Sequence, residues 1–150
     1  ELNASPRQPE SQSKVDETPT ESKMPLDRPF VAVIDDEPMI AKLVSSFLNR
    51  YGLDVRSSTT TSDARSLTHE AVAALVDIHL NGESGIDLVR ELRSSGFKNP
   101  IIVVSGDRTR ETVTESISAG ITDYLAKPFD SNALVEKLRK HTGMQLARSV

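Results

Sequence analysis

Apolar runs and helical repeats alternate along the chain from Phe30 onward. Short continuous apolar runs, such as Phe30–Ile34 and Ile101–Val104, are typical of strands that are buried on both faces. Between them lie segments with apolar residues at helical spacing, as in Pro38–Tyr51. The pattern predicts strands at 30–34, 53–56, 73–76, 101–104 and 124–126, and helices at 38–51, 62–69, 86–92, 109–119 and 131–141.

The order of these elements predicts the class of fold. Strand and helix alternate, and the strands are apolar, which is the pattern of a parallel sheet covered by helices. We therefore predict an α/β fold, a doubly wound, flavodoxin-like sheet of five parallel strands with five helices on both faces. In such folds ligands bind beyond the carboxyl ends of the strands.

Three segments differ in composition. Residues 1–28 mix Pro, Ser, Thr, Gln and Glu, contain no aromatic residue and have no apolar period, so we expect a mobile tail or linker there. Residues 29–142 form the predicted domain, and residues 143–150 form a C-terminal tail. Because the chain begins with Glu1 rather than Met, we expect a fragment or a processed form, with an upstream domain slightly favoured.

Composition excludes several classes of protein. The 150 residues carry a net charge of -4, which disfavours binding to the phosphates of nucleic acid. The chain has no Cys, which excludes disulfides, thiolate metal sites and cysteine nucleophiles. No apolar run approaches the roughly 18 residues that span a bilayer, and no signal peptide is visible. We therefore expect no direct contact with nucleic acid or membrane.

Polar residues follow four of the predicted strands, where each strand ends. Because the carboxyl ends of parallel strands share one edge, these residues should line one pocket. The four segments are Asp35-Asp36-Glu37, Asp77, Ser105-Gly106-Asp107 and Lys127-Pro128-Phe129.

This set of side chains suits phosphoryl chemistry. Carboxylates that lie close together repel one another unless a cation joins them, and Mg²⁺ prefers oxygen ligands. Asp35 and Asp36 are adjacent and are the natural metal ligands, whereas Asp77 stands alone and is the better nucleophile. Lys127 and Ser105 could then bind the phosphoryl oxygens.

The four segments together resemble the receiver domain of two-component response regulators, the CheY-like family. They occur in the family's order with similar spacing, and the resemblance covers about residues 29–142. The matching pieces are Val33–Pro38, Leu75–Ile78 with Gly85 after it, Val103–Gly106 and Asp123–Phe129.

The resemblance implies a phosphoacceptor and a metal site. Asp77 would accept a phosphoryl group from a phosphohistidine of a sensor histidine kinase or a histidine phosphotransfer domain. Asp35, Asp36 and Asp77 would hold Mg²⁺, with the backbone carbonyl of His79 as a further ligand.

It also implies the parts of a switch. Ser105 and Lys127 would bind the phosphoryl oxygens, and the Lys127–Pro128 peptide bond would be cis. Tyr124 would turn inward when Ser105 moves toward the phosphoryl group. The resemblance further implies a cytoplasmic module that binds a downstream effector, with a homodimer through the last two helices and the fifth strand as one form. We expect it to catalyse only its own phosphorylation and dephosphorylation, and a hybrid sensor kinase or a larger response regulator is the expected setting of the module.

The sequence departs from the family at three places. Leu80-Asn81-Gly82 stands where many members have Met-Pro, which leaves the shape of this loop open. Ser105 replaces the commoner Thr and keeps the hydroxyl. His79 and Asp107, two residues beyond Asp77 and Ser105, are expected to tune the lifetime of the phosphorylated state.

Two other functions and several plainer assignments compete with this hypothesis. An aspartyl-phosphate phosphatase usually has a second Asp where this chain has His79, and a receiver that serves only for docking would not need the acidic residues. Each site residue has an ordinary structural alternative as a helix cap, a turn residue or a surface charge. For His69 and His141 the plain alternative, a solvated side chain, is favoured.

Overall fold

The computed structural model describes residues 28–147. Apart from Arg28, the predicted N-terminal tail lies outside the described residues, as do residues 148–150 at the C-terminus. Within the described range, no helix is both long and apolar enough to cross a membrane.

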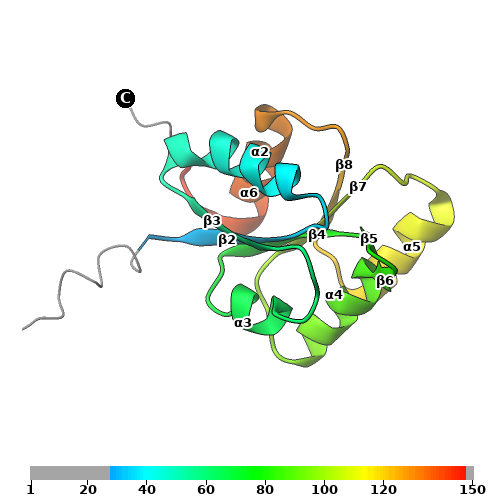
Figure 1. The fold of residues 1–150 in the computed structure, drawn as a ribbon. Helices are drawn as coiled ribbons and strands as arrows, with labels where there is room; N and C mark the ends of the chain where they lie inside the picture. The colour runs from blue at the N-terminus through cyan, green and yellow to red at the C-terminus, as the bar shows by residue number, and fades with distance from the viewer. Residues whose placement is uncertain (1–27, 148–150) are drawn as a thin grey trace, which may run out of the picture.

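A sheet of five parallel strands forms the centre of the molecule, in the spatial order β3-β2-β4-β7-β8 (Figure 1). The chain runs from β2 outward to β3, then returns past β2 to β4 and continues to β7 and β8, which confirms the doubly wound prediction. The strands are β2 (Phe30–Ile34), β3 (Asp54–Ser58), β4 (Ala73–Asp77), β7 (Ile101–Ser105) and β8 (Asp123–Ala126).

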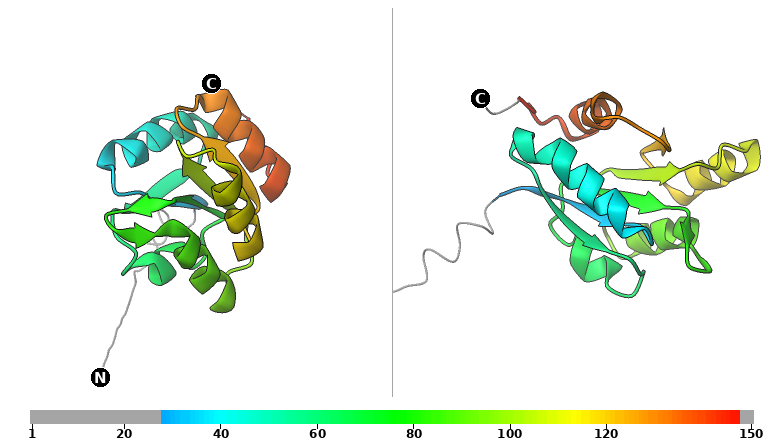
Figure 2. Two further views of the ribbon diagram at one scale, coloured as in Figure 1. Left: turned by 90° about the vertical axis from the view of Figure 1, so that its right-hand side faces the viewer. Right: turned by 45° about the horizontal axis from the view of Figure 1, so that its top comes forward.

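Five α-helices cover the sheet in the described part of the chain. In Figures 1 and 2, α2 and α6 lie on one face, and α3 and α4 lie on the other, with α5 beside α4. The helices are α2 (Pro38–Leu48, followed by the 3₁₀ turn η2, Asn49–Tyr51), α3 (Ala64–Thr68), α4 (Gly85–Ser94), α5 (Arg110–Ala119) and α6 (Ser131–Thr142).

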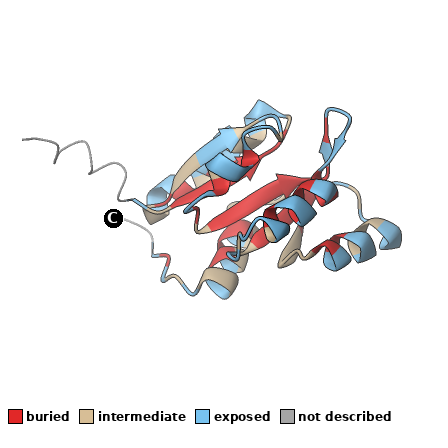
Figure 3. Cartoon of the chain, turned by 90° about the horizontal axis from the view of Figure 1, so that it is seen from below, coloured by how far each residue is buried: buried red, intermediate tan, exposed pale blue. Residues whose placement is uncertain are grey.

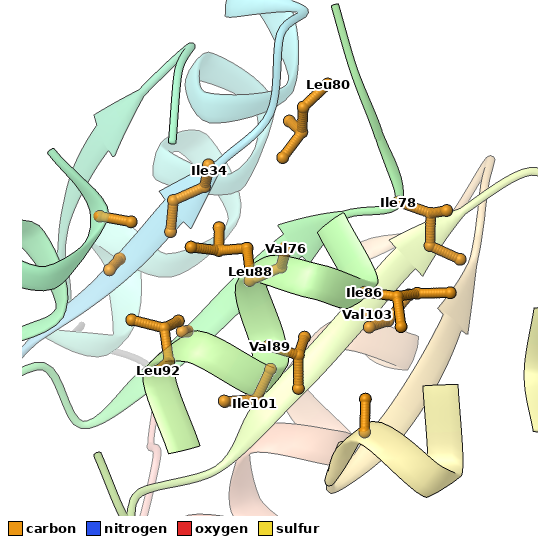
Figure 4. Packing of buried hydrophobic residues seen from close by; sticks show 14 of the residues in the cluster. Ile34, Val76, Ile78, Leu80, Ile86, Leu88, Val89, Leu92, Ile101 and Val103 are labelled. Carbon is orange, nitrogen blue, oxygen red and sulfur yellow. The ribbon is translucent and has the colours of Figure 1, made fainter. Parts of the chain in front are cut away.

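The two faces of the sheet carry separate hydrophobic cores. Because successive strand residues point to opposite faces, Ala32 and Ile34 join one cluster while Val31 and Val33 join the other. Figure 4 shows the first cluster, in which Leu88 and Val89 of α4 lie over the sheet. The inner strands are buried along their whole length, and the outward helix faces are exposed (Figure 3).

A short antiparallel hairpin follows β4 and was not predicted. Its strands, β5 (His79–Leu80) and β6 (Glu83–Ser84), are joined by Asn81 and Gly82, both at positive φ. Asn-Gly is a preferred pair for such a two-residue turn, so the sequence itself favours a hairpin at this place. The hairpin contains Leu80-Asn81-Gly82, the loop whose shape the family resemblance left open.

The sequence pattern predicts Thr61 or Ser62 as the N-cap of the helix at 62–69, and this prediction is wrong. This helix, α3, begins at Ala64, and its N-cap is Asp63, which makes no side-chain cap bond. The Thr61 hydroxyl donates instead to the carboxylate of Glu83 on the hairpin. The Thr61 side chain, which the local sequence would assign to a helix cap, therefore bonds to a segment 22 residues away instead.

Residues beyond the predicted domain boundary pack against the domain. Leu146 is buried in the second core cluster with Met144 at its edge, and the Arg139 guanidinium donates to the Leu146 carbonyl. The ordered packing therefore extends past residue 142.

Gly85 lies where the backbone of α4 comes closest to the end of β4. A Cβ atom at this position would lie 1.9 Å from the carbonyl oxygen of Asp77, which belongs to the backbone and cannot rotate away. The Gly85 N–H also donates to the carbonyl of Ile78 at 2.7 Å. The absence of a side chain at Gly85 thus allows α4 to begin directly beside Asp77.

We expect Gly85→Ala to destabilise the fold by at least about 3 kcal/mol, because the backbone must shift to remove the overlap. Gly106→Ala is the matched control, since a Cβ there meets nothing within 4 Å. Urea unfolding followed by circular dichroism measures both, as the chain has no Trp. Equal stability of the two variants would show that the close approach is not rigid.

Asp123 joins the start of β8 to the last turns of α6. Its carboxylate lies 2.8 Å from His141 Nε2 and 3.1 Å from Lys137 Nζ, and it accepts the Tyr124 N–H at 2.7 Å. His141 is therefore a half-buried, paired side chain, and the prediction that it is solvated is wrong. His69 is exposed, as predicted.

These contacts control the pKa of Asp123. Burial alone would raise the pKa of Asp123, but the bonds from His141, Tyr124 and Lys137 outweigh burial and lower it. Because the pKa is lower in the folded chain, this carboxylate stabilises the fold above its unfolded pKa of about 3.9. That stability is lost as the pH falls through the folded value.

We therefore expect Asp123→Asn to cost about 1 kcal/mol of unfolding free energy at pH 7. The difference from wild type should shrink below about pH 4, where the wild-type carboxylate also loses its charge. Asp63→Asn, at an N-cap without a side-chain cap bond, should leave stability nearly unchanged. A loss for Asp123→Asn that persists or grows in acid would contradict the assignment.

Candidate functional site

The carboxyl ends of neighbouring strands bring the predicted site residues together. The strands β2, β4, β7 and β8 are adjacent in the sheet, and each ends at or just before one of these residues. Asp35 follows β2, Asp77 ends β4, Ser105 ends β7 and Lys127 follows β8. The site is therefore a direct consequence of strand order.

Lys127 is the centre of the site. Its Nζ lies 3.0 Å from Asp35 Oδ2, 3.1 Å from Glu37 Oε1 and 3.4 Å from Asp77 Oδ2. Burial alone would lower the pKa of Lys127, but the carboxylates of Asp35 and Glu37 raise it to about 12. Lys127 therefore stays charged and partly neutralises the surrounding carboxylates.

The backbone places Lys127 in this position. Its N–H donates to the Ser105 carbonyl at 2.9 Å, which continues the pairing of β7 with β8. The Lys127–Pro128 peptide bond is cis, the isomer that the family resemblance implies.

Asp35 is buried and incompletely satisfied. Its Oδ1 accepts the Glu37 N–H at 2.9 Å, but its buried Oδ2 accepts no hydrogen bond of good geometry, although Lys127 Nζ is close. Burial raises the pKa of Asp35 and the charge of Asp77 adds to this effect, while Glu37 and Lys127 oppose it without cancelling it. Asp35 Oδ2 thus has the Lys127 ammonium as an ion-pair partner but no well-aligned hydrogen bond.

Three carboxylates converge within reach of a single cation. One oxygen from each of Asp35, Glu37 and Asp77 lies within 4.8 Å of the others. All are hard oxygen donors, and Asp35 Oδ2, which accepts no well-aligned hydrogen bond, belongs to the same group, so these residues fit a divalent ion such as Mg²⁺. Sequence reasoning placed Glu37 at the strand end but gave it no role.

Asp36 lies beside this group and has another contact. Its Oδ2 accepts the backbone N–H of Asn81, at the tip of the hairpin, at 3.1 Å. The sequence could not show this bond because it joins residues 45 positions apart. The assignments of Asp36 and of the His79 carbonyl as metal ligands stay predictions.

A hydrogen-bonded chain leads from Ser105 to the start of α5. Ser105 Oγ accepts the Asp107 N–H at 3.0 Å, and the Asp107 carboxylate accepts from Thr109 N and the Thr112 hydroxyl at 2.9 and 3.0 Å. The Tyr124 hydroxyl donates to the Asp107 carbonyl. The predicted phosphoryl-binding and switch residues are therefore connected through Asp107.

His79 and Asp107 face each other across the site. His79 Nε2 lies 3.7 Å from Asp107 Oδ2, and its side chain is mostly exposed. The bonds from Thr109 and Thr112 lower the pKa of Asp107, so this residue presents a stable negative charge at the rim. The structure brings together the two residues that were predicted to tune the lifetime, while their effect stays a prediction.

Comparison with known proteins identifies the class. Residues 31–139 match the family model of the response regulator receiver domain, so the chain belongs to this family. It is a signalling module of two-component systems, and the CheY-like fold and this membership agree with a phosphoryl-accepting switch. Receiver domains are generally non-enzymatic modules that bind Mg²⁺ in an acidic pocket and interact with histidine kinases or phosphotransfer proteins and effector domains.

Individual relatives support the same class. The chain is 31% identical over 113 residues to the response regulator protein PilR of Pseudomonas aeruginosa, covering 74% of this chain and 25% of PilR. The structure of the chemotaxis protein CheY4 of Vibrio cholerae aligns with a TM-score of 0.70 at 24% identity, over 76% of this chain and 98% of CheY4.

A Burkholderia pseudomallei response regulator, solved with a phosphorylated aspartic acid, a calcium ion and citrate, aligns with a TM-score of 0.69 at 26% identity. The alignment covers 77% of this chain and 69% of that one. The chain spans between 25% and 61% of the length of three curated relatives that it matches.

Because burial raises the pKa of Asp35, we predict that removing its charge will stabilise the fold. A carboxyl group whose pKa is raised by folding destabilises the folded state at pH values above its unfolded pKa. We expect Asp35→Asn to raise the free energy of unfolding at pH 7 in metal-free buffer by about 1 kcal/mol. Thermal unfolding in the presence of a chelator measures this change.

Adding Mg²⁺ should raise the midpoint of wild-type unfolding, because a ligand that binds only the folded state stabilises it. The same addition should have little effect on Asp35→Asn. The assignment is wrong if Asp35→Asn is less stable than wild type without metal, or gains as much from Mg²⁺.

Proposed function

We propose that the chain is a phosphorylation-dependent switch in which Asp77 accepts a phosphoryl group. The observation that carries the proposal is the position of Lys127 Nζ, between Asp77 and Asp35 at the ends of adjacent strands. A carboxylate beside a fixed ammonium group and a cation site has what an acyl phosphate requires, namely a nucleophile and nearby positive charge.

The transfer step involves few groups. An oxygen of Asp77 attacks the phosphorus of a phosphohistidine, the P–N bond breaks, and the donor imidazole keeps the electron pair and takes up a proton from solvent. Lys127 then balances charge on the phosphoryl oxygens, and the Ser105 hydroxyl donates to one of them. Mg²⁺, held by Asp35, Asp36, Asp77 and the His79 carbonyl, would supply further neutralising charge.

The change would spread from the site through Asp107. Because Ser105 Oγ accepts the Asp107 N–H, movement of Ser105 toward the phosphoryl group would change this bond. Asp107 also accepts from the Tyr124 hydroxyl and from the first turn of α5, so a shift there moves both. This supports Tyr124 and α5 as the route to the surface formed by α5, β8 and α6.

Partners follow from this chemistry. The phosphodonor would be a sensor histidine kinase or a histidine phosphotransfer domain in the cytoplasm. The downstream partner would be an effector protein or domain. On α5, the exposed Ile117 offers apolar surface for that effector or for a homodimer. The chain would serve as a module of a hybrid sensor kinase or of a larger response regulator.

Phosphorylation by acetyl phosphate with Mg²⁺, followed by intact-mass spectrometry, tests the proposal. We expect one phosphoryl adduct per chain, which is lost with a chelator and in Asp77→Asn. Lys127→Ala should form the adduct at least about tenfold more slowly, because its charge is missing in the transition state. Asp87→Asn, which changes an exposed carboxylate on α4, should behave like wild type.

Other outcomes separate the alternatives. Consumption of many donor molecules per chain without a stable adduct indicates a phosphatase. No adduct at any donor concentration indicates a docking module. An adduct that survives in Asp77→Asn places the acceptor elsewhere and contradicts the proposal.

A further inference from the structure

Glu37 contacts the functional lysine and belongs to the carboxylate cluster that fits a cation, but the transfer step described above gives it no role. Its Oε1 accepts a hydrogen bond from Lys127 Nζ at 3.1 Å, across 90 residues of sequence. This distance is close to the 3.0 Å between Lys127 and Asp35, and shorter than the 3.4 Å between Lys127 and Asp77. Lys127 is therefore bound at least as closely by Glu37 as by the phosphoacceptor.

The three carboxylates around Lys127 differ in exposure. The side chains of Asp35 and Asp77 are 2% and 8% exposed, whereas that of Glu37 is 65% exposed. Asp35 and Asp77 form the floor of the site, and Glu37 stands at its mouth. A phosphoryl group arriving from solvent therefore meets Lys127 on the side of the site where Glu37 contacts it.

The start of α2 leaves the Glu37 side chain available for this contact. Glu37 occupies the N-cap of α2, but it makes no side-chain cap bond, and Pro38 follows at the first turn. Its backbone N–H is held by Asp35 Oδ1 at 2.9 Å. The backbone of Glu37 is thus fixed beside the site while its carboxylate reaches Lys127.

We propose that Glu37 is a positioning residue that holds Lys127 at the mouth of the site and competes with the phosphoryl group for it. This inference rests on the proposed function and deepens it. When a cation occupies Asp35 and Asp77, Glu37 keeps the ammonium group nearby. When the phosphoryl group arrives, the same contact must weaken, so Glu37 lowers the rate of phosphorylation and the affinity for phosphoryl-like anions.

Two measurements on the full chain test the competition. The first is the rate of adduct formation with acetyl phosphate and Mg²⁺. The second is the affinity for beryllium trifluoride with Mg²⁺, an anionic mimic of an acyl phosphate whose binding requires no transfer step. We expect Glu37→Gln to raise both by roughly two- to fivefold, the range that a largely exposed ion pair supports.

Two further variants separate the contact from general electrostatics. Glu37→Asp keeps the charge at the mouth but withdraws the carboxylate from Lys127 by one methylene, so it should also raise the rate and the affinity. Glu111→Gln, which removes an exposed charge in the first turn of α5, should leave both unchanged.

The inference is overturned if Glu37→Gln has no effect or lowers both quantities. It is also overturned if Glu37→Asp equals wild type, or if Glu111→Gln matches Glu37→Gln, because charge alone then explains the result. These outcomes differ from failure of the proposed function, in which wild type itself forms no adduct that depends on Asp77.

Discussion

The structure depends on one electrostatic constraint, the concentration of carboxylates at the carboxyl edge of the sheet. Asp35, Glu37 and Asp77 approach one another closely, and Asp35 and Asp77 are almost fully buried. Like charges at this distance destabilise a fold unless positive charge lies among them. Lys127, delivered by the opposite half of the chain, supplies that charge in the absence of a cation. The same demand for positive charge makes the edge suitable for Mg²⁺ and for a phosphoryl group held by Lys127.

The scaffold holds this strained edge in place. Strands buried on both faces fix the positions of Asp77 and Ser105, and the lack of a side chain at Gly85 lets α4 start against the end of β4. On the far side of β8, Asp123 ties the strand to α6 through Lys137 and His141. The cost of gathering negative charge at one edge is offset by packing and pairing elsewhere, as is common at functional sites.

Sequence reasoning recovered what strand periodicity and strand-end chemistry determine. Apolar runs predict the strands, and the rule that parallel strands share a carboxyl edge predicts that Asp35, Asp77 and Lys127 lie together, as they do. It missed features that depend on contacts across long separations. The bond of Glu37 to Lys127, the pairing of His141 with Asp123 and the contact of Thr61 with Glu83 have no local signature. The hairpin is different, because Asn81-Gly82 is itself a local sequence signal for a tight turn.

A crystal structure of the chain with Mg²⁺ and beryllium trifluoride tests the central claim most directly. We predict a cation among the acidic side chains, beryllium bonded to an Asp77 oxygen, and Lys127 Nζ within hydrogen-bond distance of a fluorine atom instead of Asp77. A structure in which Lys127 keeps its contact with Asp77, or in which beryllium trifluoride binds away from Asp77, would contradict the account.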